Sequence, residues 1–72
     1  MNAKELGVRI EQRRKLLRIT QADVARLASC SVPSVVAAEK GKPTLRLEIL
    51  LSILRVLGLT IELAEQGNGD LR

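Results

Sequence analysis

The stretch TQADVARLASCSVPSVVAAEKG, residues 20–41, places the strongest constraint on the fold because it predicts two short helices joined at a tight corner. The first of these helices has a clear start. The Thr20 hydroxyl can accept a hydrogen bond from an amide of the first turn, and Asp23 completes a variant capping box that suits the positive end of a helix. We therefore expect a helix over residues 21–28, too short to be stable without packing.

The second helix of this pair has a start and a stop of its own. Ser31 is a capping residue, and Pro33 falls in the first turn, where its missing amide hydrogen is not needed. Gly41 can adopt a positive φ and ends the helix after about Lys40. Two capped helices around such a corner are typical of proteins that insert a helix into the major groove of DNA. A plain helical hairpin is the alternative.

Helical periodicity extends over most of the remaining chain. One helix is predicted over residues 3–17, with Leu6, Ile10 and Leu17 on its inner face, and another over residues 46–57. The latter has only a narrow polar stripe, whereas a helix on the surface of a monomer shows a wider one. We therefore expect an all-α fold of four to five helices, whose last helix is covered both by its own domain and by another molecule.

The residues after this helix, LTIEL at 59–63, alternate between apolar and polar, which predicts a short C-terminal β-strand. A lone strand in a helical domain lacks a partner, and a second subunit would supply one by pairing across a two-fold dimer. We expect one domain over residues 1–63 and a disordered tail over residues 64–72. The predicted dimer interface consists of Leu50, Ile53, Leu54, Leu57, Leu59, Ile61 and Leu63.

The charges are unevenly distributed. Residues 1–46 contain ten basic and four acidic side chains, a net charge of +6, whereas residues 47–72 contain two basic and four acidic side chains, a net charge of −2. The first part is therefore a candidate surface for a polyanion such as double-stranded DNA. A basic domain that is merely soluble is the alternative.

The composition excludes several other classes of protein. The chain has 72 residues, one cysteine and no histidine, so it can form neither an internal disulfide nor a structural zinc site, and oligomerisation is the remaining way to stabilise a thin core. It has no phosphate-binding glycine loop and no convincing carboxylate pair, so we predict no enzyme activity, no cofactor and no small-molecule substrate. Charges interrupt every apolar stretch, which predicts a cytoplasmic protein without a membrane span.

The segment RRKLLRITQADVARLASCSVPSVVAAEKGKPTL resembles the helix-turn-helix family of the Cro and lambda repressors, also called the xenobiotic-response-element type. Its continuation, PTLRLEILLSILRVLGLTIEL, is similar to the HipB-type antitoxin branch, whose domain ends in a short dimer-forming strand. The resemblance implies a homodimeric repressor that binds operator DNA at its own promoter and restrains a HipA-like Ser/Thr kinase toxin. A regulator without a toxin and an interaction module that has lost DNA binding remain alternatives.

The resemblance also implies roles for single residues. Gln21 corresponds to a residue that donates a hydrogen bond to a DNA phosphate. Arg14 and Glu39 correspond to a partly buried salt bridge between the first and third helices, although a solvated Arg14 is possible. The positions that correspond to core residues are Val24, Ala25, Cys30 and Val35.

The helix that would enter the groove departs from the family, because SVPSVVAA has no Arg, Lys, Asn or Gln. Valine and alanine cannot make the bidentate bonds to bases that contribute ~1–3 kcal/mol of discrimination, but they can pack against thymine methyl groups. Specificity would then depend on methyl contacts and DNA shape, and affinity on phosphates. The alternative is an apolar patch that docks a protein. The predicted DNA-binding residues are Thr20, Gln21, Ser31, Val32, Pro33, Ser34, Val36, Ala37, Lys40 and Lys42.

Overall fold

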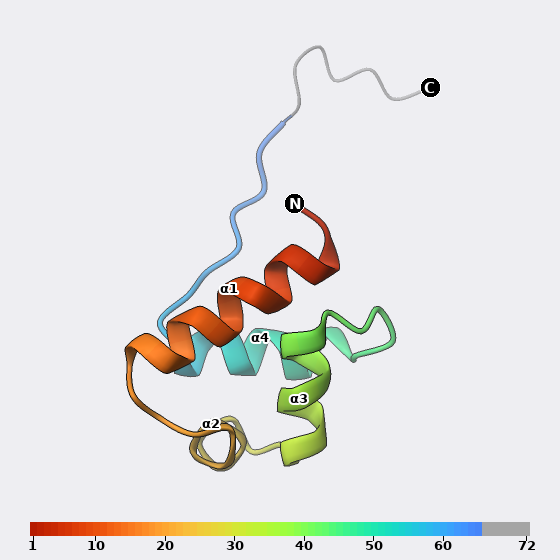
Figure 1. Cartoon of the computed structure of the whole chain (residues 1–72). Helices are drawn as coiled ribbons and strands as arrows, with labels where there is room; N and C mark the ends of the chain where they lie inside the picture. Colours follow the sequence, from red (N-terminus) through yellow and green to blue (C-terminus); the bar gives the residue numbers. More distant parts are fainter. Residues whose placement is uncertain (66–72) are drawn as a thin grey trace.

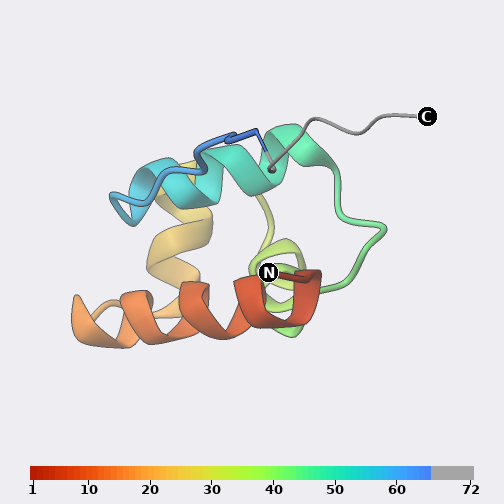
Figure 2. The same ribbon diagram turned by 90° about the horizontal axis from the view of Figure 1, so that it is seen from above.

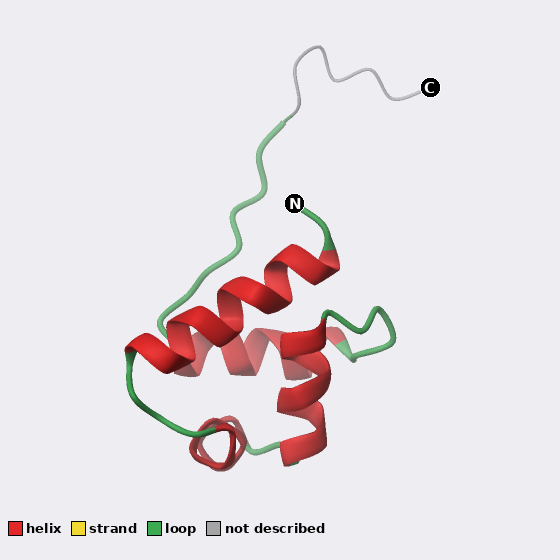
Figure 3. Ribbon diagram, in the orientation of Figure 1, coloured by secondary structure: helices red, strands yellow, loops and turns green. Residues whose placement is uncertain are grey.

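The structure, a computed structural model, describes residues 1–65, and the predicted tail therefore lies outside the described residues except for its first two. Four helices follow one another along the chain (Figure 1): α1 (Ala3–Leu16), α2 (Gln21–Ala28), α3 (Val32–Lys40) and α4 (Leu47–Val56). Figure 3 shows helices and loops but no strand in the described part of the chain. The prediction of a four-helix, all-α domain is confirmed.

The local signals at the ends of α2 and α3 act as expected. The Thr20 hydroxyl accepts from the Asp23 amide at 3.0 Å, and the Thr20 amide donates to the Asp23 carboxylate at 2.9 Å, which completes the capping box. The Ser31 hydroxyl accepts from the Ser34 amide at 3.2 Å, and Gly41 ends α3 with a φ of 68°. These ends are set by contacts over three or four residues, so they can be predicted from sequence.

One small core joins the four helices. In the view from above, α1 and α4 lie on either side of α2 and α3 (Figure 2), and α3 packs against α1 and α2. The core confirms the predicted inner positions of Ile10, Val24, Ala25 and Val35. Its buried hydrophobic side chains are Ile10, Val24, Ala25, Val35, Ala38, Ile53, Leu54 and Leu57.

This core corrects part of the predicted dimer interface. Ile53, Leu54 and Leu57 are 0%, 3% and 1% exposed, so their side chains pack within one subunit and leave almost no surface for a second one. Apolar residues occur all around α4, and their spacing alone does not show which side faces the core. The apolar side chains of α4 that remain exposed are instead Leu47 and Leu51, at 66% and 43%.

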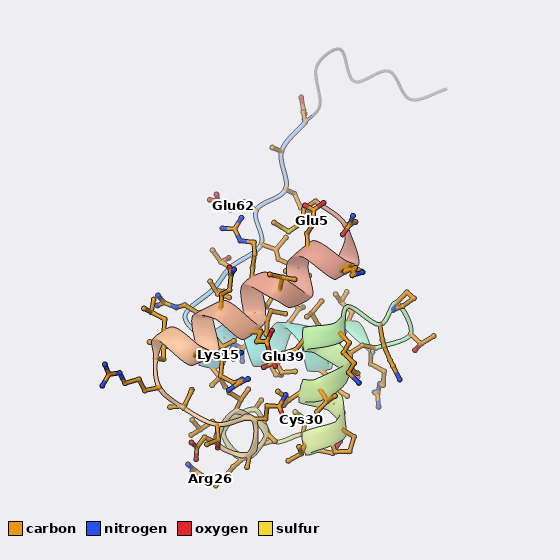
Figure 4. All side chains as sticks on the ribbon, viewed as in Figure 1. Glu5, Lys15, Arg26, Cys30, Glu39 and Glu62 are labelled. Carbon is orange, nitrogen blue, oxygen red and sulfur yellow. The ribbon has the colours of Figure 1, made fainter. Side chains whose placement is uncertain are left out.

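Two further expectations about burial were wrong in part. Leu17 is 41% exposed, because α1 ends one residue before it and the chain turns away at Arg18, whose φ is 58°. Cys30, at the corner between α2 and α3 (Figure 4), is half-buried rather than buried, although it packs against the core. Its burial is still enough to raise the pKa of the Cys30 thiol.

The segment after α4 runs back past α1 and α4 towards the N-terminus (Figures 1 and 2). Leu59 and Ile61 line a hollow together with Leu6 and Arg9 of α1 and Leu54 of α4. The Ile61 side chain is nevertheless 46% exposed, and Leu63 is 97% exposed. Within residues 1–65, no helix combines the length and the hydropathy that would be needed to cross a membrane.

Candidate nucleic-acid interface

The exposed side of α3 is almost entirely aliphatic. Val35 and Ala38 are turned into the core, whereas Val32 is 41% exposed, Pro33 is exposed, and Val36 and Ala37 are half-buried. Since α3 is held by its own caps and by buried contacts with α1 and α2, this side is presented on a fixed scaffold. The part of α3 that was predicted to enter a groove is therefore accessible, but it presents aliphatic side chains rather than hydrogen-bonding groups.

Two of the predicted DNA-binding residues, Ser31 and Ser34, are hydrogen-bonded to each other. The hydroxyls of Ser31 and Ser34 lie 2.9 Å apart and share a hydrogen bond, while the Ser31 oxygen also accepts from the Ser34 amide. At most one hydroxyl hydrogen of this pair can be directed at a ligand. Fewer side-chain hydrogen-bonding groups of α3 are thus available to a ligand than its sequence suggests.

Basic side chains lie at the C-terminal end of α3 and around the start of α2. Lys40 and Lys42 are exposed at the C-terminal end of α3. At the start of α2, a shallow hollow is lined by Lys15, Arg18 and five neighbours that include Thr20 and Gln21. Lys15 and Arg18 were not among the residues predicted for the site, although Arg18 lies only two residues before the cap of α2.

A hydrogen-bonded network joins α1, α2 and α3 behind this surface. Arg14 donates to Glu39 at 2.6 Å from Nε and 3.2 Å from Nη2, and its Nη1 donates to the carbonyl of Ile19 at 3.1 Å. The Arg14 and Glu39 side chains are only 12% and 5% exposed. Figure 4 shows Glu39 extending from α3 towards α1. The hydrogen bond to Glu39 raises the pKa of Arg14, which keeps the guanidinium charged.

Gln21 belongs to the same network. Its Nε2 donates to Oε1 of Glu39 at 3.0 Å, a contact that the sequence analysis missed because the two residues are far apart along the chain. This bond fixes which way the carboxamide points, and it leaves the amide group with a second N–H. Gln21 therefore starts α2 with an orientation set by α3.

Within residues 1–65, no cluster of three or more His, Cys, Asp or Glu side chains is arranged to hold a metal ion. What the surface does combine is an aliphatic helix face, flanking lysines and arginines, and a capped helix start. These features fit a polyanion with apolar groups between its charges.

Comparison with known proteins agrees with this geometry. The family described as "Helix-turn-helix domain" matches residues 5–66, which is most of the chain. No curated protein matches the sequence. Since the match includes most of α1, the whole of α2, α3 and α4, and the corner between α2 and α3, the chain belongs to the helix-turn-helix domain family.

Proposed function

We propose that this protein is a sequence-specific transcriptional repressor that binds operator DNA in the cytoplasm as a homodimer. The observation that carries this proposal is the accessible side of α3, which is accompanied by the basic residues at its own C-terminal end and those at the start of α2. In helix-turn-helix proteins the second helix of the motif contacts base edges, while the flanking groups contact the backbone. Lys40, Lys42 and Gln21 are the proposed phosphate contacts.

The proposed dimer uses the exposed side of α4 and the segment that follows it. Leu47 and Leu51 are exposed on α4, and Leu51 lines a hollow with Leu59 and Ile61. Contiguous apolar surface of this kind marks a contact with another molecule. In the proposed dimer, residues 59–63 of the two subunits pair as antiparallel strands, with Leu63 at the edge.

Two other leucines of the predicted interface, Leu50 and Leu59, lie partly against the core. Both are half-buried, so they contribute only their outer edges to a second subunit.

With the two copies related by a dyad, the α3 helices would enter successive major grooves, ~34 Å apart. The operator would then be a pseudo-palindrome.

A narrower form of the proposal is that the protein is the antitoxin of a HipBA-like pair and restrains a HipA-like kinase toxin. The similarity of the C-terminal third to the antitoxin branch supports it, and Leu16 and Leu27, 71% and 54% exposed, offer apolar contacts for a partner. Co-purification with the product of the neighbouring gene tests this form. A regulator without a toxin would retain no kinase.

The proposed DNA binding is tested by measuring binding to the DNA upstream of the protein's own gene and to a scrambled duplex, at two salt concentrations. We expect tighter binding to the upstream DNA, with an affinity that falls linearly in log salt as counterions are released. Equal binding to both duplexes, lost at the higher salt, would contradict sequence-specific repression. The apolar face of α3 would then be a docking site for a protein.

A further inference from the structure

We infer that α3 recognises the C5-methyl groups of pyrimidines, so that a 5-methylcytosine is read in the same way as a thymine. The inference rests on the proposed DNA binding and concerns the chemical group that the same surface recognises. It implies that methylation of cytosines within the operator strengthens binding.

The first argument is the chemistry of the exposed side of α3. Val32, Pro33, Val36 and Ala37 present only aliphatic carbon over the first turns of the helix, and Val32 is 41% exposed. No side chain of this surface can form the paired hydrogen bonds by which arginine reads guanine or glutamine reads adenine. The first lysine of the helix, Lys40, comes only at its last residue.

The second argument is that the nearby hydroxyls are already engaged. Ser31 and Ser34 share one hydrogen bond at 2.9 Å, and the Ser31 oxygen also accepts the Ser34 amide. If this surface lay against the polar edge of a base, most donors and acceptors of that edge would lose water without gaining a partner, because at most one hydroxyl hydrogen of the pair is free. Such a contact is unfavourable, so the surface selects against purely polar edges.

The third argument is the composition of the major groove. Its one apolar group is the C5-methyl of thymine. A methyl group on C5 of cytosine occupies the same position on the pyrimidine ring, and the N4 amine of the base is unchanged. An aliphatic helix face that gains affinity from the one methyl group therefore gains it from the other.

The charges beside α3 favour DNA over a protein as the occupant of this surface. Lys40 and Lys42 lie at the C-terminal end of α3, and Lys15 and Arg18 line the hollow at the start of α2, whose first residue is hydrogen-bonded to the last turn of α3. A partner must then carry negative charge next to an apolar surface. A thymine-containing major groove between two phosphate backbones has this arrangement.

The experiment begins with binding sites selected from a random-sequence duplex library. At each selected T·A pair, thymine is replaced by uracil, which removes only the methyl group. At the positions where this change weakens binding, the pair is then replaced by C·G and by 5-methylcytosine·G. We expect about a fourfold loss for each contacted methyl group, the ratio that corresponds to ~0.8 kcal/mol for one buried CH₂ group. We expect the same factor between methylated and unmethylated cytosine.

Two variants with nearly equal exposure provide the matched control. Val32 on α3 is 41% exposed and Val8 on α1 is 44% exposed. Val32→Thr replaces a methyl group with a hydroxyl of similar size, and it should lower the ratio of thymine to uracil affinity. Val8→Thr should leave this ratio unchanged, so a general loss of stability cannot produce the result.

The possible failures are distinct. If the library yields no preferred sequence, the proposed function fails and methyl recognition fails with it. If a preferred sequence is bound equally with thymine and with uracil, DNA reading stands and methyl recognition is overturned. If uracil weakens binding but 5-methylcytosine binds no better than cytosine, the claim that the two methyl groups are equivalent is overturned.

Discussion

The Gln21 carboxamide donates to the Glu39 carboxylate at 3.0 Å, which ties the first residue of α2 to the last turn of α3. The same carboxylate accepts two hydrogen bonds from Arg14 of α1. Three helices thus depend on one side chain that is 5% exposed. This network therefore fixes the position of Gln21, the proposed phosphate contact, relative to α3, the proposed recognition helix.

Replacing Glu39 with Gln should destabilise the fold, because it leaves the mostly buried Arg14 charge without its ion pair. Charge-assisted hydrogen bonds contribute ~1.5–3 kcal/mol each, so a loss of about 2 kcal/mol in the free energy of unfolding is expected in a urea titration. The matched control is Glu48→Gln. Its pair with Arg46 is 75% and 72% exposed, so this change should have little effect. Equal effects of the two changes would contradict the structural role of the network.

Gly7→Ala should also destabilise the protein, although alanine favours a helix over glycine by ~1 kcal/mol. An added Cβ would lie 2.7 Å from the Ala38 carbonyl oxygen and closer still to that of Glu39, so α1 and α3 would have to separate. Overpacking of this kind costs ~1–3 kcal/mol, which is measurable by thermal or urea unfolding. Gln12→Ala, at an exposed position of α1, should be nearly neutral. A stabilising effect of Gly7→Ala would show that the two helices lie farther apart.

The capping box predicts how stability changes with pH. The hydrogen bond from the Thr20 amide lowers the pKa of Asp23 in the folded state, below its unfolded value of ~3.9. The carboxylate therefore stabilises the fold above the unfolded-state pKa, and this contribution is lost as the pH falls through the folded-state pKa. Asp23→Asn should lower the urea midpoint at pH 7, and its difference from the wild type should shrink below about pH 4.

The control for this pH dependence is Glu62→Gln, which removes a carboxylate from an exposed position in the segment after α4. It should leave the urea midpoint at pH 7 unchanged. A difference between Asp23→Asn and the wild type that is constant from pH 7 to pH 3 would show that the carboxylate charge is not what the cap uses.

The proposed dimer predicts that Ile61→Asp and Leu51→Asp lower the mass measured by light scattering. Each change places a charge in apolar surface that a second subunit would cover. Leu27→Asp is the control, since Leu27 is 54% exposed on α2, outside the proposed interface. If both interface variants keep the mass of the wild type, residues 59–63 do not pair across a dimer.

The phosphate contacts predict a change in salt dependence. Lys42→Ala should weaken binding to all DNA sequences alike and reduce the slope of log affinity against log salt by ~0.9, the value for one phosphate contact. Arg9→Ala removes the same charge from a residue that lines the hollow beside the segment after α4. It should leave the slope unchanged. An equal slope change in both variants would mean that total charge, rather than a contact at the end of α3, governs binding.

Much of the site could be predicted from sequence because the signals are local. The starts of α2 and α3 at Thr20 and Ser31, and the end of α3 at Gly41, depend on side chains and amides within a few residues of one another. The aliphatic character of α3 is likewise evident from its amino-acid sequence. The pairing of Arg14 with Glu39 could be inferred only through resemblance, because the two residues are remote in sequence.

Other features were decided by the tertiary structure alone. The apolar residues of α4 occur on nearly every side, so only packing determines that Ile53, Leu54 and Leu57 face the core while Leu47 and Leu51 stay exposed. Packing also determines the hydrogen bond that Arg13 Nε donates to the Leu57 carbonyl at 2.8 Å. This bond joins the first helix to the end of the last one, so no local pattern predicts it.

The sequence by itself thus determined where α2 and α3 begin and end, since capping and backbone conformation are short-range effects. Only the tertiary structure decided which faces are buried, which partner Gln21 takes, and how closely Gly7 brings α1 to α3. The physical reason is that these contacts join segments far apart in the chain. Their geometry follows from the packing of whole helices and from no pattern within any one of them.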